Sequence, residues 1–422
     1  MRTDHRPRPG SPSVAIVHDY LTQRGGAERV VLLLAETFPD ACIYTSLYDP
    51  GGTFPEFAGL NIRTTPLNRI PLLRNQHRLA LPVLAPSFSA LRVDADVLLC
   101  SSSGWAHGTR THGRKVVYCH APARWLYQAD RYLGQAQSGH RSDGTESSAV
   151  TRADTLRRDA QSIPLRALSR PLRHWDRHAA TTAHRYLANS TAVSAAIRST
   201  YGLEAEVLYP PPSLAPEGPE RHVEGLDPGY FLCIARLLPY KNVHVVAQAV
   251  GTIPSARLVI VGDGPARSDI QRVAGPNVRF LGHLDDATLR GLYRNSAALV
   301  SASFEDYGLT PLEAASFGRP SVVLRSGGFL DTVVEGRTGL FFDSPDPDKI
   351  ACAMNMAIRR TWDTRGLQAH AEKFSARSFQ RRIRQVVAEE ATLSLPYPSA
   401  RPALSSRPDS KSLLSATSRK VY

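Results

Sequence analysis

Short apolar runs alternate with longer amphipathic stretches in the first half of the chain. Runs rich in β-branched residues favour strands, and apolar residues at a period near 3.6 favour helices. We therefore expect strands at Val14–His18, Ala41–Thr45, Val97–Ser101, Lys115–His120 and Arg185–Asn189, with helices after Gly25-Gly26 through Phe38 and over Thr191–Tyr201. Strands that alternate with helices in this way are typical of a parallel sheet.

The same alternation begins again after a break. Three consecutive prolines, Pro210 to Pro212, cannot enter a helix interior or a central strand, and the polar stretch that follows them is typical of a linker. From Gly229 onward we expect strands at Tyr230–Ala235, Arg257–Val261, Val278–Leu281, Ala297–Ser301 and Ser321–Leu324, and helices at Val243–Gly251, Pro265–Ala274, Asp285–Asn295 and Thr310–Phe317.

Each half of the chain thus predicts an α/β domain with a Rossmann-like parallel sheet. We expect an N-terminal domain at 1–208, a linker at 209–228, a C-terminal domain at 229–372, a helix at 373–394 that packs back on the N-terminal domain, and a disordered tail at 395–422. The polar stretch Gly134–Ile163 is expected to be a mobile insertion. Because ligands of open parallel sheets bind beyond the carboxyl ends of the strands, the cleft between the sheets is the expected site.

The charge balance narrows the class of ligand without naming it. Lys and Arg number 51 and Asp and Glu number 38, so the formal net charge is +13 over 422 residues. A basic surface favours anions, whether phosphate groups, lipid headgroups or nucleic acid. The sequence has no helix-turn-helix or RNA-binding aromatic signature, so we expect no nucleic-acid partner.

Cysteine spacing and hydropathy bear on the compartment. The five cysteines lie far apart with no C-x-x-C pair, which favours reduced thiols in a cytoplasmic protein. The polar start Met1–Ser13 lacks the apolar segment of a signal peptide, and no apolar run approaches the ~20 residues that cross a bilayer. The 14 histidines show no H-E-x-x-H or other ligand spacing, so we expect no metal.

The segment from Ser303 to Glu313 carries the densest candidate chemistry. Its sequence, SFEDYGLTPLE, follows a predicted strand and opens a predicted helix. Backbone amides at the start of a helix favour a diphosphate, and Glu305 and Glu313 could accept hydrogen bonds from sugar and ribose hydroxyls. A structural alternative stays open, in which Thr310 is the N-cap, Pro311 is the first helical residue and Glu313 completes a capping box.

Two basic residues occupy another turn between a predicted strand and a predicted helix. Arg236 and Lys241 follow the strand Tyr230–Ala235. Both could reach a pyrophosphate at the carboxyl edge of the sheet, Arg236 as a two-pronged donor and Lys241 as a point charge. The alternative is that both are solvated surface cations.

Three weaker signals lie in the N-terminal half. Gly25 and Gly26 either let the backbone approach a ligand closely or form an ordinary tight turn. His120 ends a predicted strand and could hydrogen-bond a substrate hydroxyl near neutral pH, although a single histidine is more often structural. The stretch Arg69–Leu91 mixes basic and apolar residues, which suits either an anionic membrane surface or packing against the first domain.

Together these motifs resemble the retaining glycosyltransferases of family 4, whose GT-B fold has two Rossmann-like domains with parallel sheets facing across a cleft. The resemblance covers about Val14 to Gln385 and is most specific in the E-x7-E element from Glu305 to Glu313. The N-terminal half, with HDY at 18–20, GGAER at 25–29 and YCHAPAR at 118–124, looks like a mannosyltransferase-like branch of bacterial surface polysaccharide assembly.

The resemblance implies roles for the donor-side residues. Arg236 and Lys241 would hold the donor diphosphate and stabilise the leaving nucleoside diphosphate. Glu305 would bind hydroxyls of the transferred sugar, and Glu313 would bind the ribose. The remaining donor contacts would come from backbone segments at Gly25, Gly26, Gly308, Leu309 and Thr310.

The resemblance also implies roles at the reacting centre and on the acceptor side. His120 would contact the sugar near the reacting carbon. The implied catalytic set is His120, Glu305, Arg236 and Lys241. Asp19 and Arg124 would lie on the acceptor side.

The function expected from these residues is that of a retaining glycosyltransferase. It would transfer a hexose, mannose or another, from a nucleotide diphosphate sugar to a glycan or lipid-linked acceptor, without a metal or other cofactor. We expect it in the cytoplasm, with or without peripheral contact with the anionic inner face of the plasma membrane. The alternatives are a nucleotide-sugar epimerase or phosphorylase on the same fold, and a basic nucleic-acid or membrane-binding protein. The E-x7-E element with its upstream Arg236 and Lys241 argues against the non-enzyme class.

Overall fold

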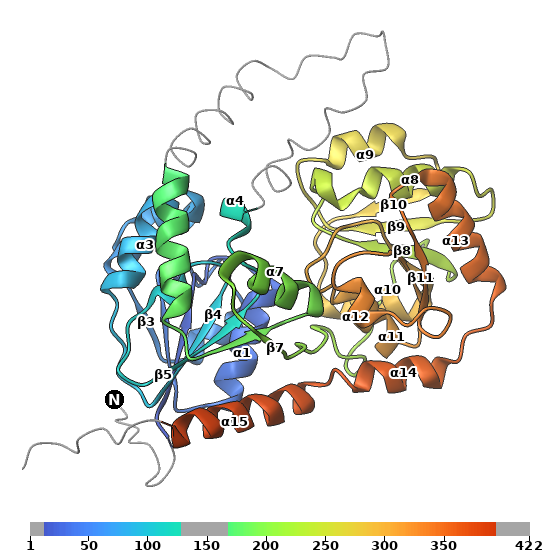
Figure 1. Cartoon of the computed structure of the whole chain (residues 1–422). Coiled ribbons are helices and arrows are strands. Elements are labelled where there is room, and N and C mark those ends of the chain that lie inside the picture. The colour runs from blue at the N-terminus through green and yellow to red at the C-terminus, as the bar shows by residue number, and fades with distance from the viewer. Residues whose placement is uncertain (1–11, 128–167, 394–422) are drawn as a thin grey trace, which may run out of the picture.

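Two α/β domains make up the part of the chain that the structure describes, residues 12–127 and 168–393. Figure 1 shows this computed structural model, with the N-terminal domain in blue and green and the C-terminal domain in yellow and orange. The predicted insertion Gly134–Ile163 and the predicted tail 395–422 lie outside the described residues. Every recorded pairing between strands of a sheet is parallel, so the predicted fold class is confirmed.

The N-terminal sheet has seven strands in the order β3-β2-β1-β4-β5-β6-β7. Its strands are β1 (Val14–His18), β2 (Cys42–Thr45), β3 (Ile62–Thr64), β4 (Val97–Ser102), β5 (Arg114–Cys119), β6 (Arg185–Ala188) and β7 (Glu206–Val207). Its α-helices are α1 (Gly26–Thr37), α2 (Pro71–Asn75), α3 (Leu81–Ala90), α4 (Arg124–Tyr127), a helix over 168–181 and α7 (Thr191–Tyr201). Short 3-10 helices lie at Pro55–Gly59, Pro66–Arg69, His77–Ala80 and Ala106–Gly108.

The C-terminal sheet has six strands in the order β10-β9-β8-β11-β12-β13. Its strands are β8 (Tyr230–Ile234), β9 (Leu258–Val261), β10 (Val278–Leu281), β11 (Ser296–Ser301), β12 (Ser321–Leu324) and β13 (Gly339–Phe342). The helices between its strands are α8 (Val243–Gly251), α9 (Arg267–Val273), α10 (Asp286–Asn295), α11 (Thr310–Ser316) and α12 (Phe329–Thr332), with a 3-10 turn at Pro239–Lys241. After the last strand come α13 (Pro347–Arg359), α14 (Thr364–Glu372) and α15 (Ala376–Thr392).

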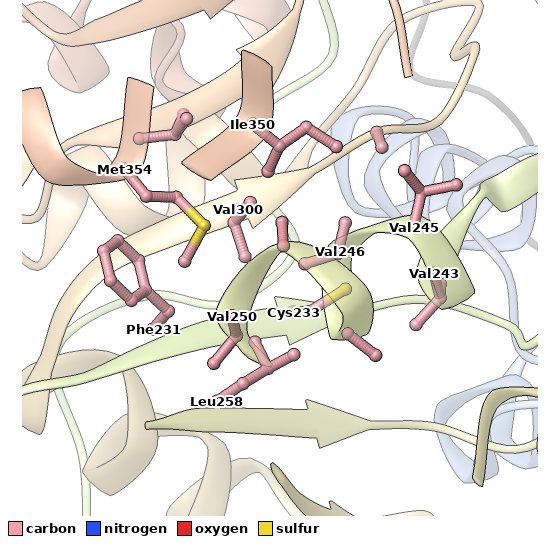
Figure 2. Packing of buried hydrophobic residues seen from close by; sticks show 14 of the residues in the cluster. Phe231, Cys233, Val243, Val245, Val246, Val250, Leu258, Val300, Ile350 and Met354 are labelled. Carbon is pink, nitrogen blue, oxygen red and sulfur yellow. The ribbon is translucent and has the colours of Figure 1, made fainter. Parts of the chain in front are cut away.

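Both sheets are buried on two faces because helices cover each side. Along β1, Ile16 packs into one apolar cluster while Ala15 and Val17 pack into another, as the two-residue repeat of a strand requires. In the C-terminal domain, Figure 2 shows Val250 of α8 and Met354 of α13 over the strands. Burial on both faces explains why these strands read as continuous apolar runs in the sequence.

The strands that the sequence pattern did not predict all lie at sheet edges. β3 and β7 end the first sheet and β13 ends the second. β3 has three residues and β7 two, and most of their side chains are partly or fully exposed. Such short edge strands carry too few apolar positions to show a period. The central elements Val14–His18, Thr191–Tyr201 and Val243–Gly251 have the predicted bounds.

The last helix, α15, packs on the N-terminal domain. Figure 1 shows it beneath that domain, where it continues from α14 of the C-terminal domain. Its apolar face, including Phe379 and Ile383, joins the cluster formed by α1 and β1. On its other flank, Arg114 pairs with Glu390 at 2.8 Å. The chain therefore returns to its first domain after completing the second.

The two sheets share one topology, with the first strand in the middle and the order reversing beside it. The reversal lies between β1 and β4 in one sheet and between β8 and β11 in the other. Ligands of open parallel sheets bind outside the carboxyl ends of the strands at this switch point. The residues after β1, β4, β8 and β11 are thus the first place to look for a site.

Contacts between the domains bring the carboxyl ends of the two sheets together. Ser190, which follows β6, donates a hydrogen bond from Oγ to the carbonyl of Asp306, which follows β11. The backbone amide and hydroxyl of Thr191 donate to the Asp331 carboxylate at 2.8 and 2.7 Å. Arg124 forms an ion pair with Asp306. The loops after the strands of one domain therefore lie against those of the other.

The basic and apolar stretch Arg69–Leu91 is only partly buried in the first domain. Leu84 and Phe88 of α3 are fully buried in an apolar cluster of that domain, which confirms packing as one part of its role. Four apolar side chains of the same stretch stay 40–57% exposed: Ile70, Leu72, Leu79 and Val83. No helix in the described ranges is long and apolar enough to cross a bilayer.

Candidate functional site

Lys241 and Glu305 meet at the switch point of the C-terminal sheet. Lys241 forms an ion pair with Glu305 Oε1, and Ser303 donates to the same oxygen at 2.6 Å. Burial raises the pKa of the Glu305 carboxyl. The charge and hydrogen bond of Lys241, with smaller contributions from Ser303 and Arg124, lower this pKa by more than burial raises it, so the net pKa is below its usual value. Glu305 is therefore ionised at neutral pH and can accept hydrogen bonds.

The turn that carries Lys241 is held by Asn242. Asn242 has a φ of 52° in the left-handed region, which Asn tolerates better than most residues. Its side-chain amide donates to the carbonyl of Ala302 at 3.0 Å, which ties the end of β8 to the end of β11. This cross-connection places Lys241 beside Glu305.

Arg236 lies at the same sheet edge in a different state from Lys241. It follows β8 and is exposed, and within the described ranges its guanidinium has no recorded partner. Lys241 is neutralised by Glu305, whereas Arg236 keeps its full charge available. An exposed guanidinium at a switch point is suited to binding a phosphate group.

Glu313 is not part of a capping box, so the structural alternative for it is wrong. The residue before α11 is Leu309, in helical conformation, and no side chain caps the helix. Glu313 instead accepts a hydrogen bond from the Tyr293 hydroxyl at 2.6 Å on Oε2 and one from the Ser213 amide at 3.2 Å on Oε1. Burial raises the pKa of this carboxyl although both hydrogen bonds lower it.

The turn before α11 requires glycine at position 308. Gly308 has a φ of 83°, and a Cβ there would lie 2.5 Å from the Phe329 ring. The amide of Gly328 donates to the Glu305 carbonyl at 2.9 Å, so α12 supports the turn. Gly308, Leu309 and Thr310 therefore form a close-packed backbone segment that links Glu305 to α11.

The glycine pair of the first domain lies against this segment. Gly25 precedes α1 and Gly26 begins it. A Cβ on Gly26 would lie 3.2 Å from Leu309 Cδ1 of the other domain. The structure thus brings together Gly26 and Leu309, which the sequence analysis placed on the same side of the candidate site.

His120 is held in a buried hydrogen-bonded network of the N-terminal domain. Its Nε2 lies 2.8 Å from Ser101 Oγ, and its carbonyl accepts a hydrogen bond from Asn189 Nδ2 at 3.0 Å. Burial lowers the pKa of His120 to about 3, and the charges of His18 and Arg124 lower it in the same direction. The ring is therefore neutral at physiological pH.

Asp19 has a structural role that the sequence did not indicate. It is buried, and its carboxylate accepts hydrogen bonds from the amides of Ser103 and Ala106 at 2.6 Å and of Trp105 at 3.2 Å. These bonds satisfy the start of the 3-10 helix Ala106–Gly108. Asp19 therefore stabilises the loop after β4, and its role on the acceptor side stays a prediction.

Arg124 lies near the donor-side residues. It begins α4, and its ion pair with Asp306 places its charge next to Glu305, whose pKa it lowers. Arg124, Lys241 and Glu305 are thus gathered at one place, while Glu313 faces Tyr293 inside its own domain.

The described residues contain no group of three or more His, Cys, Asp or Glu side chains that could hold a metal ion.

No individual role was assigned to Ser101, Tyr293 or Glu28 from the sequence. Ser101 is one of three consecutive serines, Tyr293 lies inside a helix, and Glu28 follows the glycine pair. The three serines after a buried strand were the one pattern that could have indicated a polar strand end. Tyr293 offered no such pattern.

Sequence comparison links the C-terminal domain to a known family. Residues 228–360 match the family model described as "Glycosyl transferases group 1". The chain is 32% identical over 177 residues to a glycogen synthase of Thermus thermophilus, a match covering 40% of this chain and 40% of that protein. It is 32% identical over 173 residues to the D-rhamnosyltransferase WbpZ of Pseudomonas aeruginosa, covering 39% and 43%.

These curated relatives match only in part. A GDP-mannose-dependent α-(1-6)-phosphatidylinositol monomannoside mannosyltransferase of Mycolicibacterium smegmatis is 29% identical over 173 residues, 36% of this chain and 44% of that protein. The chain spans about two fifths of the length of the curated relatives it matches. By their printed names, two of these relatives are a rhamnosyltransferase and a mannosyltransferase, and the third is a glycogen synthase.

Solved structures match over most of the chain and show its fold. Sucrose-phosphate synthase from Thermosynechococcus elongatus superposes with a TM-score of 0.63 at 17% identity, covering 90% of this chain and 100% of that one. HepE of Anabaena, solved in complex with UDP, superposes with a TM-score of 0.59 at 16% identity, covering 89% and 100%. The fold of this chain is GT-B.

Proposed function

We propose that this protein is a glycosyltransferase that uses a nucleotide diphosphate sugar as donor. The observation that carries the proposal is the cluster at the switch point of the C-terminal sheet, where the exposed Arg236 lies at the same edge as the Lys241–Glu305 pair. This cluster falls within residues 228–360, which match the group 1 glycosyl transferase model. HepE, which has the same fold, is solved with UDP and with UDP-glucose.

The charges suit the departure of a nucleoside diphosphate. As the bond between the anomeric carbon and the phosphate oxygen breaks, negative charge grows on the phosphate while the sugar becomes oxocarbenium-like. Arg236 and Lys241 would stabilise the phosphate charge, helped by the amides at Gly308, Leu309 and Thr310. Because these cations and amides could neutralise the charge by themselves, we propose that transfer needs no metal ion.

The two carboxylates would bind the two sugars of the donor. Glu305 is ionised beside Lys241, so it can accept hydrogen bonds from hydroxyls of the transferred sugar. Glu313 is buried and oriented by Tyr293, which suits binding of the ribose hydroxyls. Gly25 and Gly26 would let the first domain approach the donor, since Gly26 already lies against Leu309.

We infer the finer specificity from the motifs of the sequence. The resemblance to family 4 supports retention of the anomeric configuration and transfer of a hexose, with mannose one candidate. The mannosyltransferase of Mycolicibacterium smegmatis, which uses GDP-mannose by its name, is compatible with that candidate. The acceptor is proposed to be a glycan or a lipid-linked sugar.

The test is a screen followed by a product assay. Thermal-shift measurements with UDP-, GDP- and ADP-sugars should identify a donor that stabilises the protein by mass action. Release of the matching nucleoside diphosphate should then depend on an added acceptor and persist in the presence of a chelator. Strict dependence on added metal would contradict the cofactor proposal, and no turnover of any nucleotide sugar would contradict the function.

We further propose that the exposed apolar side chains of residues 70–83 contact an anionic membrane. Leu72 on α2 is 57% exposed, beside the basic residues Arg69 and Arg74 of the same stretch. Leu72→Glu should reduce co-sedimentation with vesicles that contain anionic lipid. Met356→Glu is the matched control, because Met356 is also 57% exposed but lies in the other domain. Equal loss in both variants, or none in Leu72→Glu, would contradict this surface.

A further inference from the structure

Four polar residues form a buried chain that ends at His120. Oε1 of Glu28, a residue of α1, lies 3.8 Å from Nε2 of His18. His18 Nδ1 lies 3.0 Å from the Ser101 carbonyl and 3.1 Å from Ser101 Oγ, which lies 2.8 Å from His120 Nε2. All four residues are buried, and the register of β1 with β4 places His18 directly beside Ser101.

The carbonyl of Ser101 sets the direction of the hydrogen bonds in this chain. A carbonyl oxygen can only accept, so His18 Nδ1 must carry a hydrogen. The same N–H also faces Ser101 Oγ, which therefore accepts from His18. The hydroxyl hydrogen of Ser101 then has His120 Nε2 as the one remaining partner recorded in the described part of the chain.

The opposite arrangement would leave a buried hydrogen without an acceptor. If His120 carried its hydrogen on Nε2, Ser101 Oγ would accept two hydrogen bonds and its own hydrogen would point at nothing recorded within residues 12–127 and 168–393. Ser101 is fully buried, and an unsatisfied buried donor is costly. His120 Nε2 is therefore an acceptor, and in the neutral ring the hydrogen lies on Nδ1.

The other end of the chain determines which histidine carries the charge. Glu28 is buried, and a buried carboxylate needs a positive partner. Burial lowers the pKa of His18, but the hydrogen bond and charge of Glu28 raise it more, with a smaller contribution from Asp19. Besides His18, the groups that face His120 are Arg124 and the edge of the Tyr118 ring, 5.3 Å away between centroids.

His120 Nδ1 remains available to a ligand. Among the described residues it has no recorded hydrogen-bond partner, and it is not one of the fully buried polar atoms that lack one. The His120 carbonyl is tied to Asn189, and the next residue, Ser190, touches Asp306 beside Glu305. The ring therefore lies at the boundary of the two domains, near the candidate donor site.

We propose that Ser101 and His18 are positioning residues that hold His120 in the tautomer with the proton on Nδ1, so that the ring donates a hydrogen bond to the sugar and does not act as a base. This inference rests on the proposed glycosyl transfer for its substrate, but the tautomer itself does not depend on that function. Glu28 supports the arrangement by raising the pKa of His18, which favours its charged form.

Long-range ¹H–¹⁵N NMR on protein labelled at histidine tests the tautomer directly, with His120 assigned by its loss in His120→Gln. We expect the Nδ1-protonated neutral form between pH 6 and pH 8, a mixture of tautomers in Ser101→Ala, and restoration in Ser101→Thr. An Nε2-protonated ring, or titration of His120 near its ordinary pKa, would overturn the proposal. This readout holds even if no nucleotide sugar is turned over, in which case only the proposed function fails.

Kinetics test the positioning role separately. Ser101→Ala should lower kcat about tenfold, the order expected for one lost hydrogen bond, with the KM for the donor changed by no more than about twofold. Thr37→Val is the matched control, since it removes another buried hydroxyl of the same domain, one that bonds the Leu33 carbonyl. A wild-type kcat in Ser101→Ala, or an equal loss in Thr37→Val, would refute the role of Ser101.

Glu28→Gln gives a second variant that keeps the shape of the side chain. Loss of the carboxylate charge should discharge His18 and thereby raise the pKa of His120. The His120 resonances should then titrate at a higher pH than in the wild type. Unchanged His120 titration in a folded Glu28→Gln protein would show that His18 does not carry the charge.

Discussion

The carboxyl ends of the two sheets have the same topology but opposite polar character. In the N-terminal domain, His18, Ser101 and His120 are buried and bond one another. In the C-terminal domain, Arg236 is exposed, with no partner recorded in the described ranges, and Lys241 pairs with Glu305. The same place in a fold is therefore a pre-oriented hydrogen-bond donor in one domain and a source of free positive charge in the other.

The difference follows from how each strand ends. β4 extends to Ser102 with every residue buried, so polar groups at its end must be satisfied inside the protein. After β8 the chain leaves the sheet through a turn on which Arg236 is exposed, whereas the side chain of Lys241 is 12% exposed and pairs with Glu305. Substitutions in the first domain should accordingly change the orientation of hydrogen-bonding groups, and substitutions in the second should change the positive charge available to a phosphate group.

The largest effect is expected for Glu305→Ala, which should reduce glycosyl transfer by at least about 100-fold. The substitution removes a sugar contact and also frees Lys241 from its partner. Binding of the nucleoside diphosphate alone should therefore be unchanged or tighter, measured by calorimetry. Glu217→Ala, at an exposed position of the linker, is the control and should leave transfer intact. Wild-type turnover in Glu305→Ala would remove Glu305 from the site.

Loss of either cation should have the next largest effect. Arg236→Ala and Lys241→Ala should each weaken nucleoside diphosphate binding by about 1–3 kcal/mol, as for a hydrogen bond to a charged group. Added salt should reduce the difference between wild type and variant, because screening weakens exposed charges. Arg272→Ala, whose guanidinium pairs with Asp269 on the surface, is the control. Unchanged calorimetric affinity in both variants would count against the charge-based site.

Asp19→Asn should affect stability rather than substrate binding. An amide can replace only part of the acceptor capacity of a carboxylate that bonds the amides of Ser103, Trp105 and Ala106. We expect the free energy of unfolding to fall by about 1–3 kcal/mol in chemical denaturation. A raised acceptor KM with unchanged stability would instead support the acceptor-side role that the resemblance implies.

The smallest expected effect is on the pH dependence of stability. The pKa of His120 in the folded protein is about 3, below its ordinary value of 6.5. Between these two values the ring is protonated in the unfolded chain but neutral in the folded protein. Stability is therefore lost as the pH falls below about 6.5, by less than about 1 kcal/mol between pH 7 and pH 6. The raised pKa of His18 acts in the opposite direction. His120→Gln should remove the acid-side loss, so equal pH dependence in both proteins would contradict a neutral buried His120.

The candidate site of the second domain was largely predictable because its parts are local in sequence. A strand, a turn and a helix occur consecutively around Glu305 and again around Lys241, so short motifs place these side chains at one sheet edge. The sequence pattern left two choices open there: the role of Glu313, and whether Arg236 and Lys241 bind a ligand or are solvated surface cations. The capping box failed because Tyr293, twenty residues earlier, offers its hydroxyl to the Glu313 carboxylate inside the domain.

The network of the first domain could not be predicted in this way. His18 and Ser101 are 83 residues apart, and they meet because β1 pairs with β4 on one side while it pairs with β2 on the other. Asp19 meets the amides after β4 for the same reason. Hydrophobic periodicity indicates which residues are buried but not which strands are neighbours.

The sequence by itself therefore determined the alternation of strands and helices, the division into two domains and the charged turns of the second domain. The partners of the buried polar groups were decided by strand order and register, which depend on how the whole sheet packs. A hydrogen bond between His18 and Ser101 has no local precursor, because neither residue forms it until both strands lie side by side.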